Sequence, residues 1–107
     1  MFARIVEFEV KLEKKNELLR EVKNEILPIL KKQPGFVEIL PFSEEIKPEK
    51  VVAITLWHTK RDAERYVQET SYKLSEMVKP YLATPIVVRT FTLETTICKH
   101  FVEALTV

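Results

Sequence analysis

The chain has little of several residue types that mark large classes of protein. Its 107 residues include one glycine and one cysteine, and 17 lysines and arginines almost balance 16 acidic residues. A single cysteine excludes an internal disulfide, so we expect Cys98 to be a structural thiol in a reducing compartment. The net charge of +1 lacks the basic excess that is typical of nucleic-acid binders, so no nucleic-acid partner is expected.

Long apolar runs and metal-ligating clusters are also missing from the sequence. No run approaches the roughly 18 apolar residues that a membrane span needs, so no membrane partner is expected. The opening MFARIVEFEV has neither a basic leader nor a continuous apolar stretch, which predicts a cytoplasmic protein. The two histidines, His58 and His100, are far apart in the sequence and have no cysteine cluster beside them, so no metal site is expected.

What the sequence does have is a regular succession of strand and helix patterns. Alternating apolar residues and, for the third strand, a run rich in β-branched and aromatic residues predict four strands, over 2–10, 36–42, 51–57 and 86–96. Helical spacing predicts helices over 12–32 and 59–82. The order β-α-β-β-α-β predicts an α+β, ferredoxin-like fold with a four-stranded antiparallel sheet. We expect one domain over residues 1–96, followed by a tail, 97–107, that packs on a dimer partner.

Four local signals refine the expected helix boundaries. Pro28 lies inside the first helical pattern and should kink or end that helix, because it cannot donate to the carbonyl of Asn24. Gly35, the only glycine, should serve a tight turn. The motif Thr59-x-x-Asp62 resembles a capping box at the start of the second helix. A bend is expected in that helix at residues 70–71.

The third predicted strand, VVAITLW, is apolar on both faces. Two helices can cover only one face of a four-stranded sheet, and the other face of an antiparallel sheet is usually polar. An exposed apolar sheet face is either an interface or an aggregation hazard. The simplest cover is the same face of a second copy, so the pattern predicts a two-fold homodimer.

Several segments together resemble the antibiotic biosynthesis monooxygenase-like superfamily over about residues 2–95. They are QPGF between the first helix and second strand, ITLW followed by HTKRDAERY, and the later YLATPIVVRTF. The resemblance implies a dimeric α+β barrel with a pocket between sheet and helices. It further implies a monooxygenase that uses no cofactor and acts on a small aromatic, phenol- or quinol-like substrate.

The chain departs from the family pattern in ways that leave a second function open. Oxygenases of this kind tend to use an asparagine on a pocket strand, and none of the predicted strands contains one. Many members have a histidine on the second helix, where this chain has Val67 and Gln68, so haem degradation is not expected. The alternative is a non-catalytic dimeric module that binds a small ligand or has a stress-related role.

RNA binding is not expected, because the third strand lacks the required glycine and aromatic pair.

Four residues near the expected pocket are candidates for its lining. Trp57 ends the third strand and either lines the pocket or packs in the core. His58 could act in acid–base chemistry, but an exposed loop position is favoured. Tyr66 and Tyr72 belong to an aromatic helix face that favours a ligand, although a packed Tyr66 with a satisfied hydroxyl is the simpler interpretation.

Two arginines occupy interior positions of the first and fourth strands. A charge at Arg4 or Arg89 is costly to bury unless it is paired. Each could bind an anionic substrate group. The favoured interpretation is that each pairs with a nearby acidic residue or extends to the edge of the dimer interface. The acidic candidates are Glu7, Glu38 and Glu94.

Overall fold

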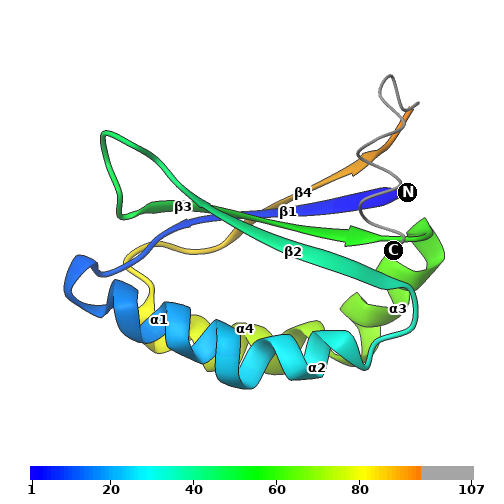
Figure 1. Cartoon of the computed structure of the whole chain (residues 1–107), viewed down its shortest axis with the longest axis horizontal. Coiled ribbons are helices and arrows are strands. Elements are labelled where there is room, and N and C mark those ends of the chain that lie inside the picture. Colours follow the sequence, from blue (N-terminus) through cyan, green and yellow to red (C-terminus); the bar gives the residue numbers. More distant parts are fainter. Residues whose placement is uncertain (95–107) are drawn as a thin grey trace.

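Residues 1–94 are described by the computed structural model, and they contain the predicted β-α-β-β-α-β order (Figure 1). The strands are β1 (Phe2–Glu9), β2 (Phe36–Ser43), β3 (Lys50–Trp57) and β4 (Val87–Thr92). The first helical segment consists of η1 (Leu12–Lys14), α1 (Lys15–Glu21), η2 (Val22–Ile26) and α2 (Leu27–Lys31). The second consists of α3 (Lys60–Glu69), α4 (Ser71–Val78) and η3 (Lys79–Tyr81).

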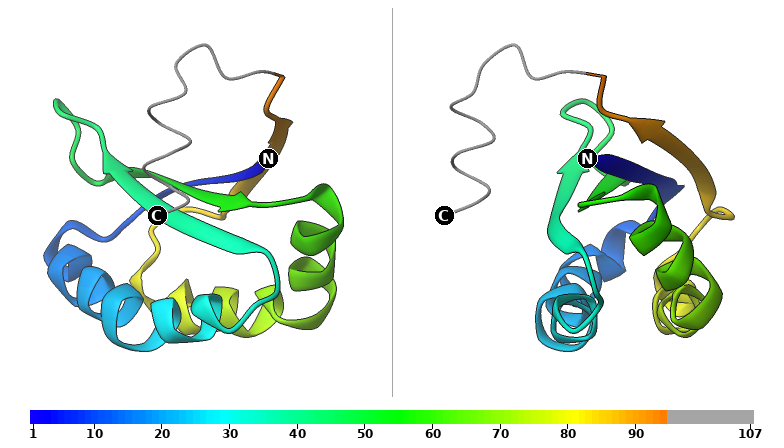
Figure 2. Two further views of the ribbon diagram at one scale, coloured as in Figure 1. Left: turned by 45° about the vertical axis from the view of Figure 1, so that its right-hand side comes forward. Right: turned by 90° about the vertical axis from the view of Figure 1, so that its right-hand side faces the viewer.

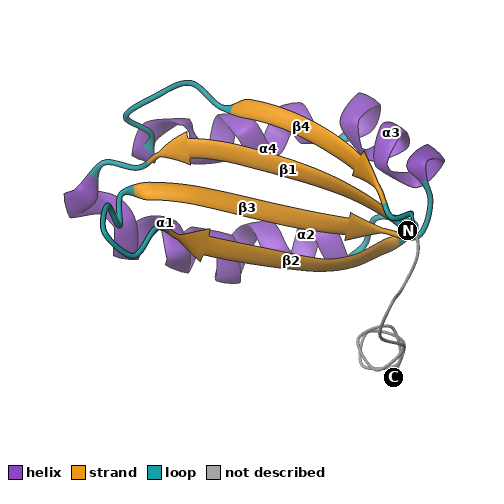
Figure 3. Ribbon diagram, turned by 90° about the horizontal axis from the view of Figure 1, so that it is seen from above, coloured by secondary structure: helices purple, strands orange, loops and turns teal. Residues whose placement is uncertain are grey.

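The sheet has the strand order β2-β3-β1-β4, with every neighbouring pair antiparallel (Figure 3). Phe2 is paired with Trp57 on β3 and with Thr92 on β4, so these side chains share one face of the sheet. This arrangement confirms the predicted ferredoxin-like α+β fold. Both helical segments lie on one face of the sheet (Figure 2).

Of the two effects expected at Pro28, an early end does not occur, because the first helical segment passes through the proline and continues to Lys31. The chain instead widens into the π-helical turn η2 just before the proline, and the N–H of Leu27 donates to the carbonyl of Val22. This i to i+5 bond shifts the hydrogen-bond register of the helix. Pro28 then falls in the first turn of α2, where a missing N–H is tolerated.

The second helical segment matches its prediction closely. Thr59 caps α3, since the N–H of Asp62 donates to Thr59 Oγ1 at 3.1 Å and Thr59 Oγ1 donates to Asp62 Oδ2 at 2.8 Å. The predicted bend lies at Thr70, which separates α3 from α4. The fourth strand is shorter than expected: β4 spans only Val87–Thr92. The tail, 97–107, and its expected packing on a dimer partner lie outside the described residues.

The core lies between the sheet and the helices in two clusters of buried side chains. One surrounds Trp57 and the other lies near the start of α1 and the end of β1. The first contains Phe2, Ile26, Leu30, Trp57, Ala63, Tyr66 and Leu74, and the second contains Phe8, Val10, Leu18 and Val51. The helix-facing side of the sheet is therefore covered by the chain's own helices.

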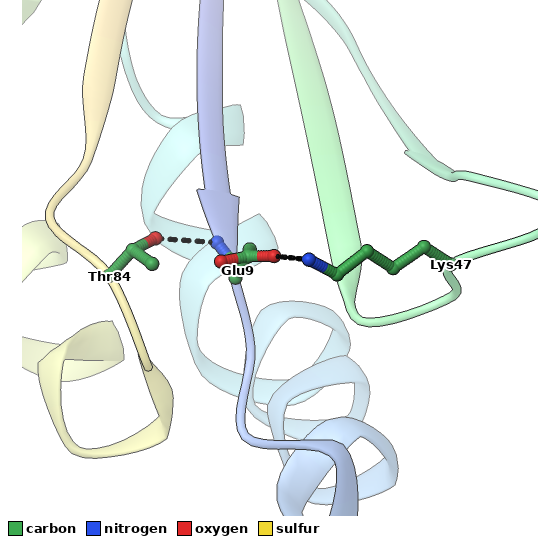
Figure 4. A network of polar contacts seen from close by, with 3 residues as sticks. All are labelled: Glu9, Lys47 and Thr84. Carbon is green, nitrogen blue, oxygen red and sulfur yellow. Dashed lines mark hydrogen bonds and ion pairs between the residues drawn. The ribbon is translucent and has the colours of Figure 1, made fainter.

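At the end of β1, Glu9 makes polar contacts with both the β2–β3 loop and the segment that leads to β4 (Figure 4). The N–H of Glu9 donates to Thr84 Oγ1 at 2.8 Å, and the Glu9 carboxylate pairs with Lys47 of the β2–β3 loop. The N–H of Ala83 also donates to the carbonyl of Glu9 at 2.7 Å. This contact ties the β2–β3 loop and the segment leading to β4 to the strand between them.

The opposite face of the sheet carries apolar side chains at its centre, as predicted, together with the charged residues Glu7, Glu38 and Arg89, and no helix within residues 1–94 covers it (Figure 2). Ile5 and Ile54 are paired at its centre and are half-buried. Towards the two edge strands, Phe42 is 55% exposed and Phe91 is 52% exposed. We call this surface the open face.

Candidate functional site

A cavity of about 320 Å³ lies between the sheet and the helices. Its polar lining residues are Arg4, Thr55, Tyr66, Ser71 and Ser75. The remaining lining residues are aliphatic or aromatic: Val6, Phe8, Leu18, Val22, Ile26, Leu30, Ile39, Ala53, Leu74, Val78, Ile86 and Val88. A mostly apolar cavity with a few polar groups is the usual form of a small-molecule site.

Local sequence explains why this space is not filled. Alternation along β1 places Arg4, Val6 and Phe8 on the helix-facing side, and Val6 is paired with Ala53 on β3. The small side chain of Ala53 leaves room in the centre of the sheet. Val88 lines the cavity and is nevertheless 43% exposed, so the cavity opens along the edge strand β4.

Arg4 is the only charged residue among the described residues that line the cavity. Its Nε is buried without a hydrogen-bond partner, and none of the ion pairs found within residues 1–94 includes it. Its guanidinium carbon lies 5.6 Å from the centre of the Tyr66 ring, in cation–π geometry. Burial lowers the pKa of Arg4, but an arginine side chain remains protonated in proteins.

Strand parity explains why neither Glu7 nor Glu38 pairs with Arg4. Glu7 lies an odd number of residues from Arg4 on the same strand and therefore on the opposite face. Glu38 is paired with Leu56, which also belongs to the open face. Pairing of Arg4 with either residue, which the sequence favoured, is therefore wrong. The third acidic candidate, Glu94, forms no ion pair with Arg4 in the described part of the chain.

Tyr66 contributes its ring and hydroxyl to the same end of the cavity. No hydrogen bond to the Tyr66 hydroxyl is formed within residues 1–94, so this group is available to a ligand. Burial raises the pKa of Tyr66, and the nearby charge of Arg4 opposes that effect. Tyr66 therefore remains protonated at neutral pH and can donate a hydrogen bond.

Trp57 lies behind Tyr66 and does not line the cavity. It is 0% exposed, stacks on Tyr66 with ring centres 4.9 Å apart, and meets the edge of Phe36 at 5.5 Å. Its Nε1–H donates to Thr55 Oγ1 at 3.1 Å, and Thr55 Oγ1 in turn donates to the carbonyl of Arg4 at 3.3 Å. Trp57 thus supports the tyrosine and threonine that form the wall.

The other candidate residues lie away from the cavity. His58 is exposed after β3, and its N–H donates to the carbonyl of Gly35 at 2.8 Å. Tyr72 is 76% exposed on α4. Arg89 lies on the open face and pairs with Glu7 at 3.5 Å, which is one of the partners expected for it. The structure brings together Arg4 and Tyr66 from this set.

Three hydroxyl residues of the lining were not singled out from the sequence. Thr55 lies two residues before Trp57 and therefore shares its face, which is a signal that strand alternation provides. Ser71 and Ser75 are four residues apart on one face of α4. Their hydroxyls donate to the carbonyls of Val67 and Ser71, at 2.8 and 3.3 Å, so the helix itself uses these protons.

Residues 1–94 contain neither a metal-binding cluster nor a membrane-spanning helix. No group of three or more histidine, cysteine, aspartate or glutamate residues there could hold a metal ion. In the same part of the chain, no helix has the length and apolar character required to cross a membrane.

Solved structures with the same fold come from several bacteria. A monooxygenase from the gene ActVA-Orf6 of Streptomyces coelicolor, in complex with nanaomycin D, is 19% identical with a TM-score of 0.75, covering 91% of this chain and 90% of that chain. SnoaB, a cofactor-independent oxygenase from Streptomyces nogalater, is 18% identical with a TM-score of 0.72, covering 90% and 95%. A protein from Nitrosomonas europaea described as an antibiotic biosynthesis monooxygenase is 20% identical with a TM-score of 0.70, covering 89% and 100%.

Similarity to these structures supports the fold, and the sequence itself identifies the family. A comparison with curated proteins finds no match. The family profile described as antibiotic biosynthesis monooxygenase matches residues 1–74, which is more than half of the chain. The chain therefore belongs to the antibiotic biosynthesis monooxygenase family.

Proposed function

We propose that this protein is a cofactor-independent oxygenase that oxidises a small phenol- or quinol-like aromatic in the cavity. The observation that carries the proposal is the pair of free donors, the Arg4 guanidinium and the Tyr66 hydroxyl, at one end of an apolar cavity. Such donors stabilise negative charge on a substrate oxygen where water is excluded. The named activity of the S. nogalater structure and the ligand in the S. coelicolor structure support the same class of chemistry.

The reaction needs only substrate and oxygen. An activated aromatic methylene loses two hydrogens and gains one oxygen atom to become a carbonyl, which releases four electrons. Dioxygen accepts these electrons, leaving one atom in the product and the other in water. In this reaction Arg4 favours the phenolate form of the substrate through its charge, and Tyr66 donates a hydrogen bond to the phenolate oxygen.

We further propose that the protein is a homodimer in which the open faces of two sheets pack together. The support is the group of apolar residues on that face, which includes Ile5, Ile54 and the exposed Phe42 and Phe91. A surface of this kind normally marks an interface in a soluble protein. Packing two such faces closes the barrel that is typical of this fold family.

A specific observation also favours a second function, non-catalytic binding of a small ligand. The described residues that line the cavity include no histidine, asparagine, aspartate, glutamate or cysteine. A proton from the substrate would therefore have to leave to solvent, because the lining offers no conventional general base.

Oxygen consumption decides between the two functions. Purified protein is incubated with anthrone-like and hydroquinone substrates in an oxygen electrode, and the products are analysed by mass spectrometry. We expect oxygen uptake, and we expect Tyr66→Phe to lower kcat/KM about 100-fold because one donor to the oxyanion is lost. Tyr72→Phe is the matched control, because Tyr72 is exposed on the neighbouring helix. No uptake with any substrate would favour the binding module.

A further inference from the structure

We propose that the ligand of this cavity is a small apolar carboxylate, which binds with its carboxylate at Arg4. The inference relies on the cavity being the binding site named above, but it does not require oxygenase chemistry. It extends the proposed function from aromatic substrates in general to substrates that are already ionised before they bind.

The charge balance of the cavity is the first reason. Arg4 contributes a permanent positive charge, and no residue that lines the cavity in the described part of the chain neutralises it. The buried Nε has no hydrogen-bond partner there. Buried arginines are normally paired, because an unpaired buried charge is costly. Strand parity keeps Glu7 and Glu38 on the other face, so neither of these described residues can be the partner, and an anionic ligand in the cavity would supply one.

The second reason is what happens to Arg4 when a ligand fills the cavity. A bound molecule displaces the water that still solvates the guanidinium. A neutral ligand would leave the charge without compensation, and the loss of hydration would oppose binding. A carboxylate replaces that water with charge-assisted hydrogen bonds, for which the planar guanidinium is well suited. The cavity should therefore select anions.

The position of Arg4 also fixes the orientation of the ligand. Arg4 lines a second hollow of about 330 Å³, at the edge formed by β1, β4 and α3, which also includes Lys60 and Glu64, an ion pair at 3.8 Å. The guanidinium thus lies between this hollow and the main cavity, and the anionic group should lie at this boundary. The opposite part of the cavity is formed by apolar side chains such as Phe8 and Leu18, which suits a hydrocarbon or aromatic body.

Isothermal titration calorimetry with a matched pair of probes tests the proposal. The probes are 2-naphthoate and 2-naphthalenemethanol, which share their aromatic body and differ in charge. We expect the carboxylate to bind at least about tenfold more tightly to the wild-type protein, a difference of about 1.4 kcal/mol. We expect Arg4→Met to remove this preference and Arg4→Lys to retain part of it. Arg61→Met, at an exposed arginine on α3, should leave the preference unchanged.

Thermal unfolding of the ligand-free variants separates ligand binding from a structural role. Because Arg4 is an uncompensated charge, Arg4→Met should leave Tm unchanged or raise it, whereas loss of a structural residue would lower it. Equal affinity for the two probes in the wild-type protein would overturn the proposal without any variant. Binding of neither probe, or an unchanged preference in Arg4→Met, would also overturn it.

The two proposals can fail independently. Selective binding of 2-naphthoate without oxygen uptake by any substrate would refute the oxygenase and leave the anion site intact. Oxygen uptake with neutral substrates, at a rate that Arg4→Met does not change, would refute the anion site and the role of Arg4 in favouring the phenolate, but it would leave the oxygenase activity itself intact.

Discussion

Gly35 illustrates how one residue can determine the geometry between two elements. It has a φ of +76°, a conformation that other residues rarely adopt, and its carbonyl accepts the N–H of His58. A Cβ atom at this position would lie 2.1 Å from Oδ2 of Asp62, the residue that completes the cap of α3. The turn after α2 and the start of α3 therefore approach each other as closely as a glycine allows.

We predict that Gly35→Ala lowers the free energy of unfolding by about 1 to 3 kcal/mol, which is the cost of a left-handed conformation in a residue other than glycine. Displacement of Asp62 from its cap adds to that cost. Urea unfolding followed by circular dichroism measures the change. Lys32→Ala, at an exposed position near the same turn, is the control and should change stability little. A Gly35→Ala variant as stable as this control would contradict the prediction.

The π-helical turn η2 shows how an element can adapt to a residue that opposes it. Pro28 removes one hydrogen-bond donor from the first helical segment, and the change of register at Leu27 accommodates it. The same turn includes Val22 and Ile26, both of which line the cavity. The sequence indicated a disturbance at this proline. The structure adds that the disturbance helps to form the wall of the site.

The contact of Glu9 with Lys47 predicts a dependence of stability on pH. The hydrogen bond from Lys47, and then its charge, lower the pKa of Glu9 below 4.5. A carboxyl group whose pKa is lower in the folded state stabilises the protein at pH values above its unfolded-state pKa. This contribution is lost as pH falls through the folded-state pKa. We therefore predict that Glu9→Gln is less stable than wild type at pH 7 and that the difference shrinks as pH falls through the lowered pKa of Glu9.

Urea unfolding at pH 7, 5 and 3 measures this difference. Both side chains are partly exposed, so the effect should be small and should weaken in high salt. Glu45→Gln is the matched control, because Glu45 is exposed in the same loop and forms none of the ion pairs found within residues 1–94. A difference between wild type and Glu9→Gln that persists unchanged at pH 3 would refute the assignment.

At the scale of the whole molecule, the open face is the feature that connects fold to assembly. One layer of helices covers one face of the sheet, and the described residues place no helix on the other. The apolar residues of that face follow from strand alternation, and the register aligns them across neighbouring strands. The proposed dimer is the arrangement that would remove this surface from water.

We predict that Ile54→Lys converts a wild-type dimer into a monomer, because it places a charge at the centre of the open face. Size-exclusion chromatography with multi-angle light scattering measures the mass at micromolar concentration. Leu19→Lys is the control, since Leu19 is 46% exposed on α1, on the other side of the molecule, and should leave the mass unchanged. A wild-type protein that is already monomeric would refute the proposed dimer.

The sequence by itself determined the strands, the helices and the identity of the two sheet faces, because these depend on local periodicity. It also indicated Arg4 and Tyr66, since alternation and helical spacing direct both towards the interior. It favoured a paired Arg4 and left Trp57 between pocket and core. Those questions depend on distances between residues far apart in the chain. Only the tertiary structure decided them, through the β2–β3 register that places Glu38 on the other face and through the stacking that places Tyr66 between Trp57 and the cavity.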